Sequence, residues 1–351
     1  MRSFGFSHAP QYLTFGTGAF AKLPDAMRAC EGTRALLVAS PSQRGAGDRA
    51  QALLGPALAG RFDGVAPHVP GAAVDALAAQ ASEVGADVLV ALGGGAAIDL
   101  CKAAAAQTPR RVLAIPTTYG GSELTLHAGR TDEHNKSAVA SGAPRAVIYD
   151  PQLTYDLPTR AGAGSAMNAL AHCVEALYAP KAQPLALLAA EAGLRTIPAP
   201  LRAVATAPHD ANAREELLFG AYLAAVALAG SGMALHHRIC HVLGGRYGIA
   251  HGDANAVILP HAARFNAPAA RDAMAIIARA LGVTDAPAGL AALARDSGAA
   301  TSLSELGPER TEFPAIADAA LSQPLTNPRP VDREAVTALL EAAWSPAPNL
   351  S

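Results

Sequence analysis

Short, continuous apolar runs in the first 150 residues most constrain the fold of this chain. Three of them span residues 34–40, 86–92 and 111–115, and each ends in a segment rich in Gly, Pro, Ser or Thr. Such a run is typical of a strand buried on both faces, as in a parallel sheet. Helical patterns alternate with these runs. The alternation predicts a Rossmann-like, doubly wound parallel sheet.

The pattern changes after residue 151, where strand-like runs stop and helical patterns divided by Pro and Gly continue to the end. We therefore predict an α/β dinucleotide-binding domain over residues 1–155 and an all-helical catalytic domain over residues 156–351. The helices expected in the second domain are 162–179, 185–196, 210–230, 231–243, 253–264, 269–281, 286–297 and 332–344. Short strands are also expected within residues 11–20 and near 61–66, with a helix near 21–30.

Composition excludes several classes of partner. The net charge is −2 over 351 residues and there is no basic stripe, so nucleic acid is not expected as a partner. The N-terminus lacks the apolar core of a signal peptide, and the uncharged run at 217–235 is diluted by Ala, Gly and Ser, which favours a buried helix over a membrane span. The four cysteines lie far apart and form no Cys-x-x-Cys pair. We expect a cytoplasmic protein with no membrane partner.

A triple glycine, Gly93, Gly94 and Gly95, stands between a predicted strand and a predicted helix. Glycines at a helix N-terminus let a pyrophosphate approach free backbone N–H groups closely. A glycine turn alone is weak evidence, but a second loop, residues 117–122, follows the very next strand. Two such loops at adjacent strand ends favour a dinucleotide lying across the sheet.

The end of the strand at 34–40 bears on which dinucleotide is used. Many dinucleotide-binding folds place an acid there for the ribose hydroxyls, whereas this chain has Ser40, with Arg44 close behind. A site without that carboxylate should not repel a 2′-phosphate, and Arg44 could pair with one. We expect NADPH to be accepted as well as NADH.

The second domain contains a polar cluster inside apolar helical segments. Asn168 and His172 are four residues apart, as are His237 and His241, so each pair projects from one face of its helix. His251 follows shortly afterwards. Buried polar groups are costly unless they are satisfied or used, and a set of five favours a functional site over isolated core histidines.

Motifs along nearly the whole chain resemble the iron-containing (group III) alcohol dehydrogenase superfamily, and within it the maleylacetate reductase branch. The motifs are Gly93–Gly95 with Asp99 and Lys102, residues 116–123, 149–151, 168–172 with 175–178, 235–245, 259–261 and 327–330. The resemblance implies a dehydroquinate-synthase-like two-domain fold that uses NADH or NADPH. The resemblance and the two loops together indicate eleven cofactor-binding positions. They are Ser40, Arg44, Gly93, Gly94, Gly95, Asp99, Thr117, Thr118, Tyr119, Ser122 and Lys136.

Metal-using members of that superfamily hold iron or zinc through one Asp and three His, and these positions correspond to Asn168, His172, His237 and His251 here. The amide at 168 removes the anionic ligand that would offset the charge of a divalent ion. We expect no metal at this site, with Fe²⁺ or Zn²⁺ bound by these four residues as the alternative.

The resemblance implies NAD(P)H-dependent reduction of the carbon–carbon double bond of maleylacetate to 3-oxoadipate, a step in aromatic compound degradation, by a homodimer. We assign His172, His237 and His251 to binding and polarisation of the ketone, Asn168 to orientation, and His241 to proton donation. Lys136 and Arg246 are candidate cations for the substrate carboxylates.

Three other functions remain open from the sequence. One is a metal-dependent alcohol or hydroxy-acid dehydrogenase of the same superfamily. Another is a lyase resembling sugar-phosphate cyclising synthases, although Asn168 and the small number of charged residues in the second domain argue against it. The third is a binding module that has kept the dinucleotide but lost the chemistry.

Overall fold

The computed structural model describes residues 11–132, 135–180 and 182–346, without the side chains of residues 135–137. The chain divides between Leu157 and Pro158 into two compact units; the sequence placed the boundary at 155. We call the described residues up to Leu157 the sheet unit and those from Pro158 the helical unit. Each unit has a hydrophobic core of its own.

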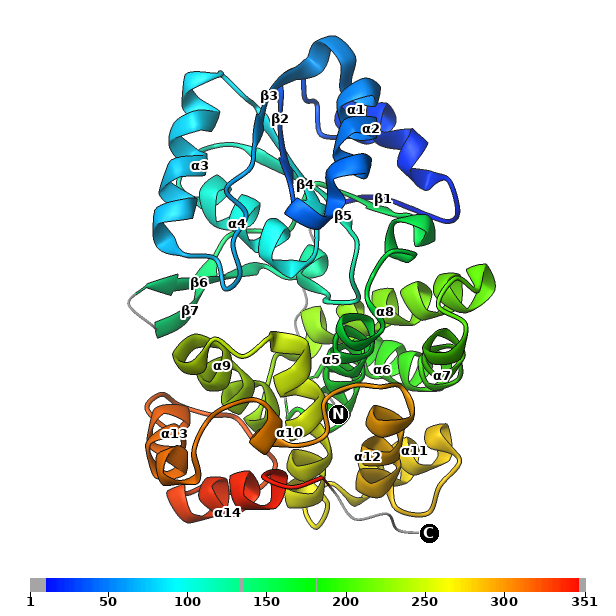
Figure 1. Ribbon diagram of the computed structural model, residues 1–351, viewed down its shortest axis with the longest axis vertical. Helices are drawn as coiled ribbons and strands as arrows, with labels where there is room; N and C mark the ends of the chain where they lie inside the picture. The colour runs from blue at the N-terminus through cyan, green and yellow to red at the C-terminus, as the bar shows by residue number, and fades with distance from the viewer. Residues whose placement is uncertain (1–10, 133–134, 181, 347–351) are drawn as a thin grey trace. The chain divides into compact units, whose positions relative to one another are not determined.

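A six-stranded parallel sheet forms the centre of the sheet unit (Figure 1). Its strand order is β1-β8-β5-β4-β2-β3, and each neighbouring pair is parallel. The strands are β1 Tyr12–Phe15, β2 Ala35–Ala39, β3 Leu58–Phe62, β4 Val88–Gly93, β5 Arg111–Pro116 and β8 Ala146–Tyr149. β2, β4 and β5 coincide with the three apolar runs, which confirms the predicted sheet. The strand predicted at 61–66 was placed too late.

Helices cover both faces of this sheet, as Figure 1 shows. Alternate strand residues such as Leu37, Val90 and Ile115 share one core cluster with α1 (Leu23–Ala29) and α2 (Arg44–Leu54). The opposite face is covered by α3 (Gly71–Glu83) and α4 (Gly95–Ala106), which pack on each other, and α4 packs on β4 and β5. The predicted helix near 21–30 is split into a short 3₁₀ turn and α1.

An antiparallel hairpin, not predicted from the sequence, lies outside this sheet. It pairs β6 (His127–Asp132) with β7 (Asn135–Ala140). Its sequence is polar and lacks the alternation typical of a half-buried strand. Contacts outside the hairpin hold it instead, because β6 packs on α4 and the side chain of Asp99 accepts a hydrogen bond from the backbone N–H of Gly129.

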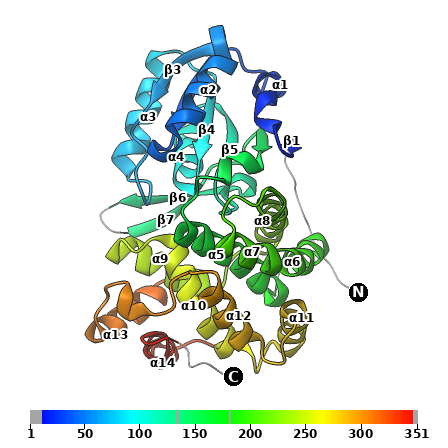
Figure 2. The same cartoon turned by 45° about the vertical axis from the view of Figure 1, so that its right-hand side comes forward.

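The helical unit is built around α5 (Thr159–Tyr178), most of whose residues are buried. It packs against α6, α8 and α10 (Figure 2). The other helices are α6 Pro184–Thr196, α7 Pro198–Thr206, α8 Ala211–Ser231, α9 Leu235–Tyr247, α10 His251–Asn266, α11 Arg271–Leu281, α12 Ala286–Asp296, α13 Phe313–Ala320 and α14 Arg333–Ala343. α7 and α13 were missed in the sequence, because both are short and begin at or beside a proline.

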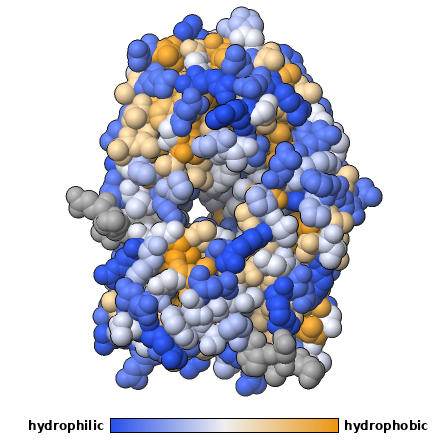
Figure 3. All heavy atoms as spheres, viewed as in Figure 1, coloured by the Kyte–Doolittle hydropathy of each residue, from blue (hydrophilic) through white to orange (hydrophobic). Residues whose placement is uncertain are grey.

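Two apolar stretches of the helical unit are broken by the fold. The run at 217–235 is divided between α8 and α9, which bend by 103°. The stretch Arg271–Asp296 meets the length and hydropathy criteria of a membrane span but contains two helices, α11 and α12. In the space-filling view, hydrophobic residues are interspersed with hydrophilic ones over the visible face (Figure 3).

Candidate active site

The carboxyl ends of β2, β4 and β5 lie level with one another in the sheet unit. Ala39 pairs with Leu92, and Gly93 pairs with Pro116, so Ser40, the glycines and Thr117 leave adjacent strands at the same edge. The chain order reverses between β2 and β4, since β3 lies outward from β2 while β5 and β8 lie on the other side of β4. In open α/β sheets a ligand binds at the carboxyl edge beside such a switch point.

The glycines at this edge allow close approaches that a side chain would block. A Cβ on Gly93 would lie 2.0 Å from the hydroxyl oxygen of Ser40, and one on Gly94 would lie 3.0 Å from Thr118. Gly94 is the N-cap of α4, and a Cβ on Gly95 would meet nothing within 4 Å. The start of α4 therefore offers backbone N–H groups and the positive end of a helix beside open space, which fits a pyrophosphate.

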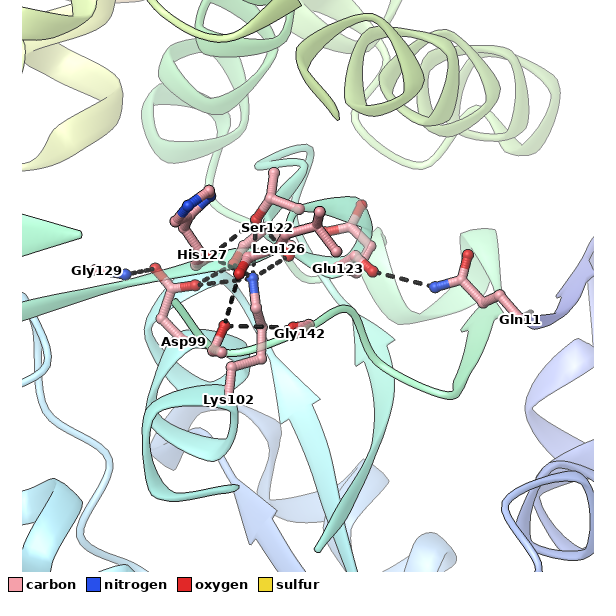
Figure 4. Close-up of polar contacts among 11 residues, drawn as sticks. Gln11, Asp99, Lys102, Ser122, Glu123, Leu126, His127, Gly129 and Gly142 are labelled. Atoms are coloured by element: carbon pink, nitrogen blue, oxygen red, sulfur yellow. Dashed lines mark hydrogen bonds and ion pairs between the residues drawn. The ribbon is translucent and has the colours of Figure 1, made fainter. Parts of the chain in front are cut away.

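Asp99 and Lys102 join α4 to the loop after β5 (Figure 4). The buried Lys102 Nζ donates to the carbonyl oxygens of Ser122 (2.8 Å) and His127 (2.5 Å) and to the hydroxyl of Thr125 (2.8 Å). Asp99 accepts from the Ser122 hydroxyl and from the Gly129 backbone at 3.0 Å. Burial lowers the pKa of Lys102 to about 8. Asp99 and Ser122, both predicted to bind the cofactor, therefore also shape this loop.

The remaining predicted cofactor residues differ in exposure. Thr117 and Tyr119 are buried, and Thr118 is half-buried between Gly94 and Gly120. Arg44 is exposed at the first residue of α2. The backbone of Lys136 pairs with Thr131 in the β6–β7 hairpin, but its side chain lies outside the described part of the chain.

The predicted polar cluster comes together within the helical unit. α5 contributes Asn168 and His172, α9 contributes His237 and His241, and His251 is the first residue of α10. The rings of His172 and His237 are stacked with centroids 4.7 Å apart, and those of His241 and His251 are stacked at 5.7 Å. Asn168, His172 and His237 are buried, whereas His241 and His251 are partly exposed. The cluster thus has a buried part and a part open to solvent.

A buried carboxylate, Glu175, belongs to this cluster and was not among the predicted site residues. Its Oε2 lies 2.6 Å from Nδ1 of His237, while Nε2 of the same ring lies 3.3 Å from Oδ1 of Asn168. Glu175 lies about one turn beyond His172 on α5, so it shares a face of the helix with Asn168 and His172. The sequence offered two signals, because Glu175 is a charged residue in a largely apolar segment and belongs to the motif at 175–178.

Burial keeps several of these groups in their neutral or paired states. It lowers the pKa of His172 well below the ordinary value, and His237, His236 and His241 lower it further. Burial also lowers the pKa of His236 to about 3. For Glu175 burial acts in the opposite direction, but nearby His237 and the hydrogen bonds to this carboxylate bring its pKa below the usual range.

The residues at the superfamily's metal position are Asn168, His172, His237 and His251. Among the residues that the structure describes, one group of three His, Cys, Asp or Glu side chains has its donor atoms within 4.8 Å of one another, namely Glu175, His236 and His237. The donor atoms of His172, His237 and His251 do not all lie within that distance of one another. The fourth residue at the position, Asn168, is neutral. This position therefore lacks the anionic ligand of metal-using members, and its three imidazoles are not gathered within that distance.

Comparisons with known proteins cover both units. Residues 10–151 match the iron-containing alcohol dehydrogenase family, and residues 162–344 match the Fe-containing alcohol dehydrogenase family, C-terminal. A maleylacetate reductase of Burkholderia cepacia is 42% identical over 346 residues, which cover 98% of each chain. Maleylacetate reductase 1 of Rhodococcus opacus is 40% identical over 97% of this chain and 96% of its own.

A solved structure gives the same assignment. The crystal structure of maleylacetate reductase from Agrobacterium tumefaciens superposes with a TM-score of 0.91 at 37% identity, covering 98% of this chain and 99% of the other. Both the parallel-sheet unit and the helical unit are included in this match. The chain therefore belongs to the iron-containing alcohol dehydrogenase family, in its maleylacetate reductase branch.

Proposed function

We propose that this enzyme uses NADH or NADPH to reduce the carbon–carbon double bond of maleylacetate, giving 3-oxoadipate. The observation that carries the proposal is the cluster of four imidazoles around Asn168, where metal-using members of the superfamily have a carboxylate. The near full-length similarity to maleylacetate reductases supports the choice of substrate.

The residues at the carboxyl edge of the sheet fit the cofactor. Gly94 and Gly95 at the start of α4 would receive the pyrophosphate, and Ser40 lies at the strand end where the ribose binds in many such folds. When bound, the nicotinamide supplies the hydride that reduces the double bond. Asp99, Ser122 and Lys102 hold the loop that carries Thr117, Thr118 and Tyr119.

The helical unit would handle the charge and the proton. Maleylacetate is an enone, so hydride addition to the carbon β to the ketone places negative charge on the ketone oxygen. Ring N–H groups of His172 and His251 are suited to donate hydrogen bonds to that oxygen. His237 would orient them, because its Nδ1 faces Glu175 and its Nε2 faces Asn168. Completion of the reduction requires a proton at the neighbouring carbon. His241 is partly exposed, so it can be reprotonated from solvent after each turnover.

The amide of Asn168 supports the metal-free chemistry of this proposal. A carboxylate can only accept hydrogen bonds, whereas an amide can turn its NH₂ group toward Nε2 of His237. The contact at 3.3 Å is therefore satisfied without a metal ion. The substrate carboxylates would still need cations. Arg246 is exposed, although its Nη1 donates a hydrogen bond to the carbonyl oxygen of Ala315.

A substrate panel tests the function. The oxidation of NADH and NADPH would be followed by absorbance with maleylacetate and, in parallel, with a series of aldehydes and ketones. We expect turnover with maleylacetate and formation of 3-oxoadipate, identified by mass spectrometry. Efficient reduction of aldehydes with no turnover of maleylacetate would replace this proposal with an alcohol dehydrogenase.

A further inference from the structure

Glu175 is almost completely buried, with 1% of its side chain exposed, yet the proposed reaction gives it no part. A buried carboxylate is costly unless each of its oxygens is satisfied. In this protein the partners come from a helix other than its own. All three of them lie at the start of α9, the helix that carries His237 and His241.

Two of the three partners are backbone N–H groups. Ala234 donates to Oε2 at 2.8 Å, and His236 donates to Oε1 at 2.9 Å. Ala234 is the N-cap of α9, and its methyl side chain cannot accept a hydrogen bond from the first N–H groups of the helix. Glu175 therefore caps α9 from a neighbouring helix and places a negative charge at the positive end of the helix dipole.

The third partner is the ring of His237, and here the geometry selects one tautomer. Nδ1 lies 2.6 Å from Oε2, and a carboxylate accepts hydrogen bonds, so Nδ1 carries the proton. His236 fits this arrangement. Its Nε2 lies 3.2 Å from the backbone oxygen of Asn255 and must donate, which leaves the lone pair of its Nδ1 facing Nδ1–H of His237 at 3.3 Å.

We propose that Glu175 is a positioning residue for the reaction: it fixes both the Nδ1–H tautomer and the ring plane of His237. Nε2 of His237 is then directed at Asn168, and the ring is stacked on His172. Because the same carboxylate also caps α9, the start of this helix and the ring of His237 are held in a fixed position relative to each other. The kinetic part of this inference rests on the proposed function, whereas the tautomer does not.

A metal ion shared by Glu175, His236 and His237 fits these contacts poorly. Both carboxylate oxygens already accept backbone hydrogen bonds from α9, and Nδ1 of His237 is protonated. A metal ion would have to displace that proton from Nδ1 of His237.

The direct test is the tautomer of His237 in the unmodified enzyme at neutral pH. Long-range ¹H–¹⁵N spectra distinguish the two neutral tautomers, and the spectrum of His237→Gln identifies which signals belong to His237. We expect Nδ1 to carry the proton. A proton on Nε2 with a bare Nδ1 would overturn the inference. This result does not depend on whether maleylacetate is the substrate.

A double-mutant cycle tests whether Glu175 acts on the reaction through His237. Glu175→Gln should lower kcat about 10- to 100-fold and change KM for maleylacetate by less than about threefold, as expected for loss of an outer partner. In a His237→Gln background the same change should alter kcat by less than about twofold, since the two residues act as one unit. Equal losses of kcat in both backgrounds would show that Glu175 acts only as a helix cap.

Two controls separate these outcomes from misfolding and from a wrong substrate. Glu191→Gln makes the same change in an exposed ion pair with Arg195 on α6 and should leave kcat within about twofold. If Glu175→Gln does not fold, the spectrum of the unmodified enzyme decides the matter. Absence of maleylacetate turnover in the unmodified enzyme, with the Nδ1–H tautomer present, would reject the proposed function and keep the tautomer assignment.

Discussion

A Cβ atom added to Gly252 would lie 2.8 Å from the carbonyl carbon of Gly164, and a Cβ on Gly164 would meet the carbonyl carbon of Gly252 at the same distance. The backbones of α5 and α10 thus touch where they cross. Gly252 directly follows His251, and Gly164 lies one turn before Asn168. The two glycines therefore set the spacing between the parts of the cluster carried by α5 and α10.

Gly252→Ala should separate these helices. We expect it to destabilise the protein by about 1–3 kcal/mol, the usual cost of overpacking, and to lower turnover because His251 moves with the start of α10. Thermal unfolding and steady-state kinetics would measure both effects. Gly45→Ala is the matched control for stability, because a Cβ there meets nothing within 4 Å. Unchanged stability and turnover in Gly252→Ala would contradict the spacing role.

His241→Ala should lower kcat by about a hundredfold or more, which is the usual contribution of a general acid. The solvent isotope effect on kcat should also change, since proton delivery would then come from water. His209→Ala, an exposed histidine of the same unit, should have the activity of the unmodified enzyme. A near-normal rate for His241→Ala would remove His241 from proton donation.

Arg44→Ala should discriminate between the two cofactors. A charge-assisted hydrogen bond contributes about 1.5–3 kcal/mol, so its loss should raise KM for NADPH about tenfold or more. KM for NADH should change little, because NADH has no 2′-phosphate. The unmodified enzyme should use both cofactors, and a preference for NADH above about a hundredfold would argue against this role of Arg44.

His261 should make stability depend on pH. Burial, with a smaller effect of Arg264, lowers the pKa of His261 from 6.5 to about 4. Between these values the unfolded chain takes up a proton that the folded chain does not. The free energy of unfolding should therefore fall as the pH drops from 6.5 toward 4, by at most about 3 kcal/mol from this group.

The variant His261→Leu isolates this contribution. His261 lines a cavity of about 240 Å³ together with Val257 and Ala291, so an apolar side chain fits there. Urea unfolding of both proteins at pH 7 and pH 5 should show a smaller loss of stability on acidification in the variant. Equal losses in the two proteins would show that His261 does not contribute.

The sheet and the polar pairs on α5 and on α9 could be predicted from the sequence because both depend on local spacing. The apolar runs of β2, β4 and β5 and the four-residue spacing within α5 and α9 are visible in any short window. The β6–β7 hairpin could not be predicted, because contacts with α4 stabilise it rather than its own pattern.

Glu175 shows the same limit within the site. Its place in a family motif did not indicate its role, because that role depends on backbone N–H groups 59 and 61 residues further along the chain. The structure also shows that Asp99 and Ser122, which the sequence suggested only as cofactor contacts, bond to each other.

The most direct test of the account measures metal content and maleylacetate turnover on one sample. The enzyme would be dialysed against a chelator, its iron and zinc determined by mass spectrometry, and its NADH- and NADPH-dependent rates compared before and after. We predict an unchanged rate at far less than one metal ion per chain. A rate that disappears with the metal and returns when Fe²⁺ or Zn²⁺ is added would contradict the account.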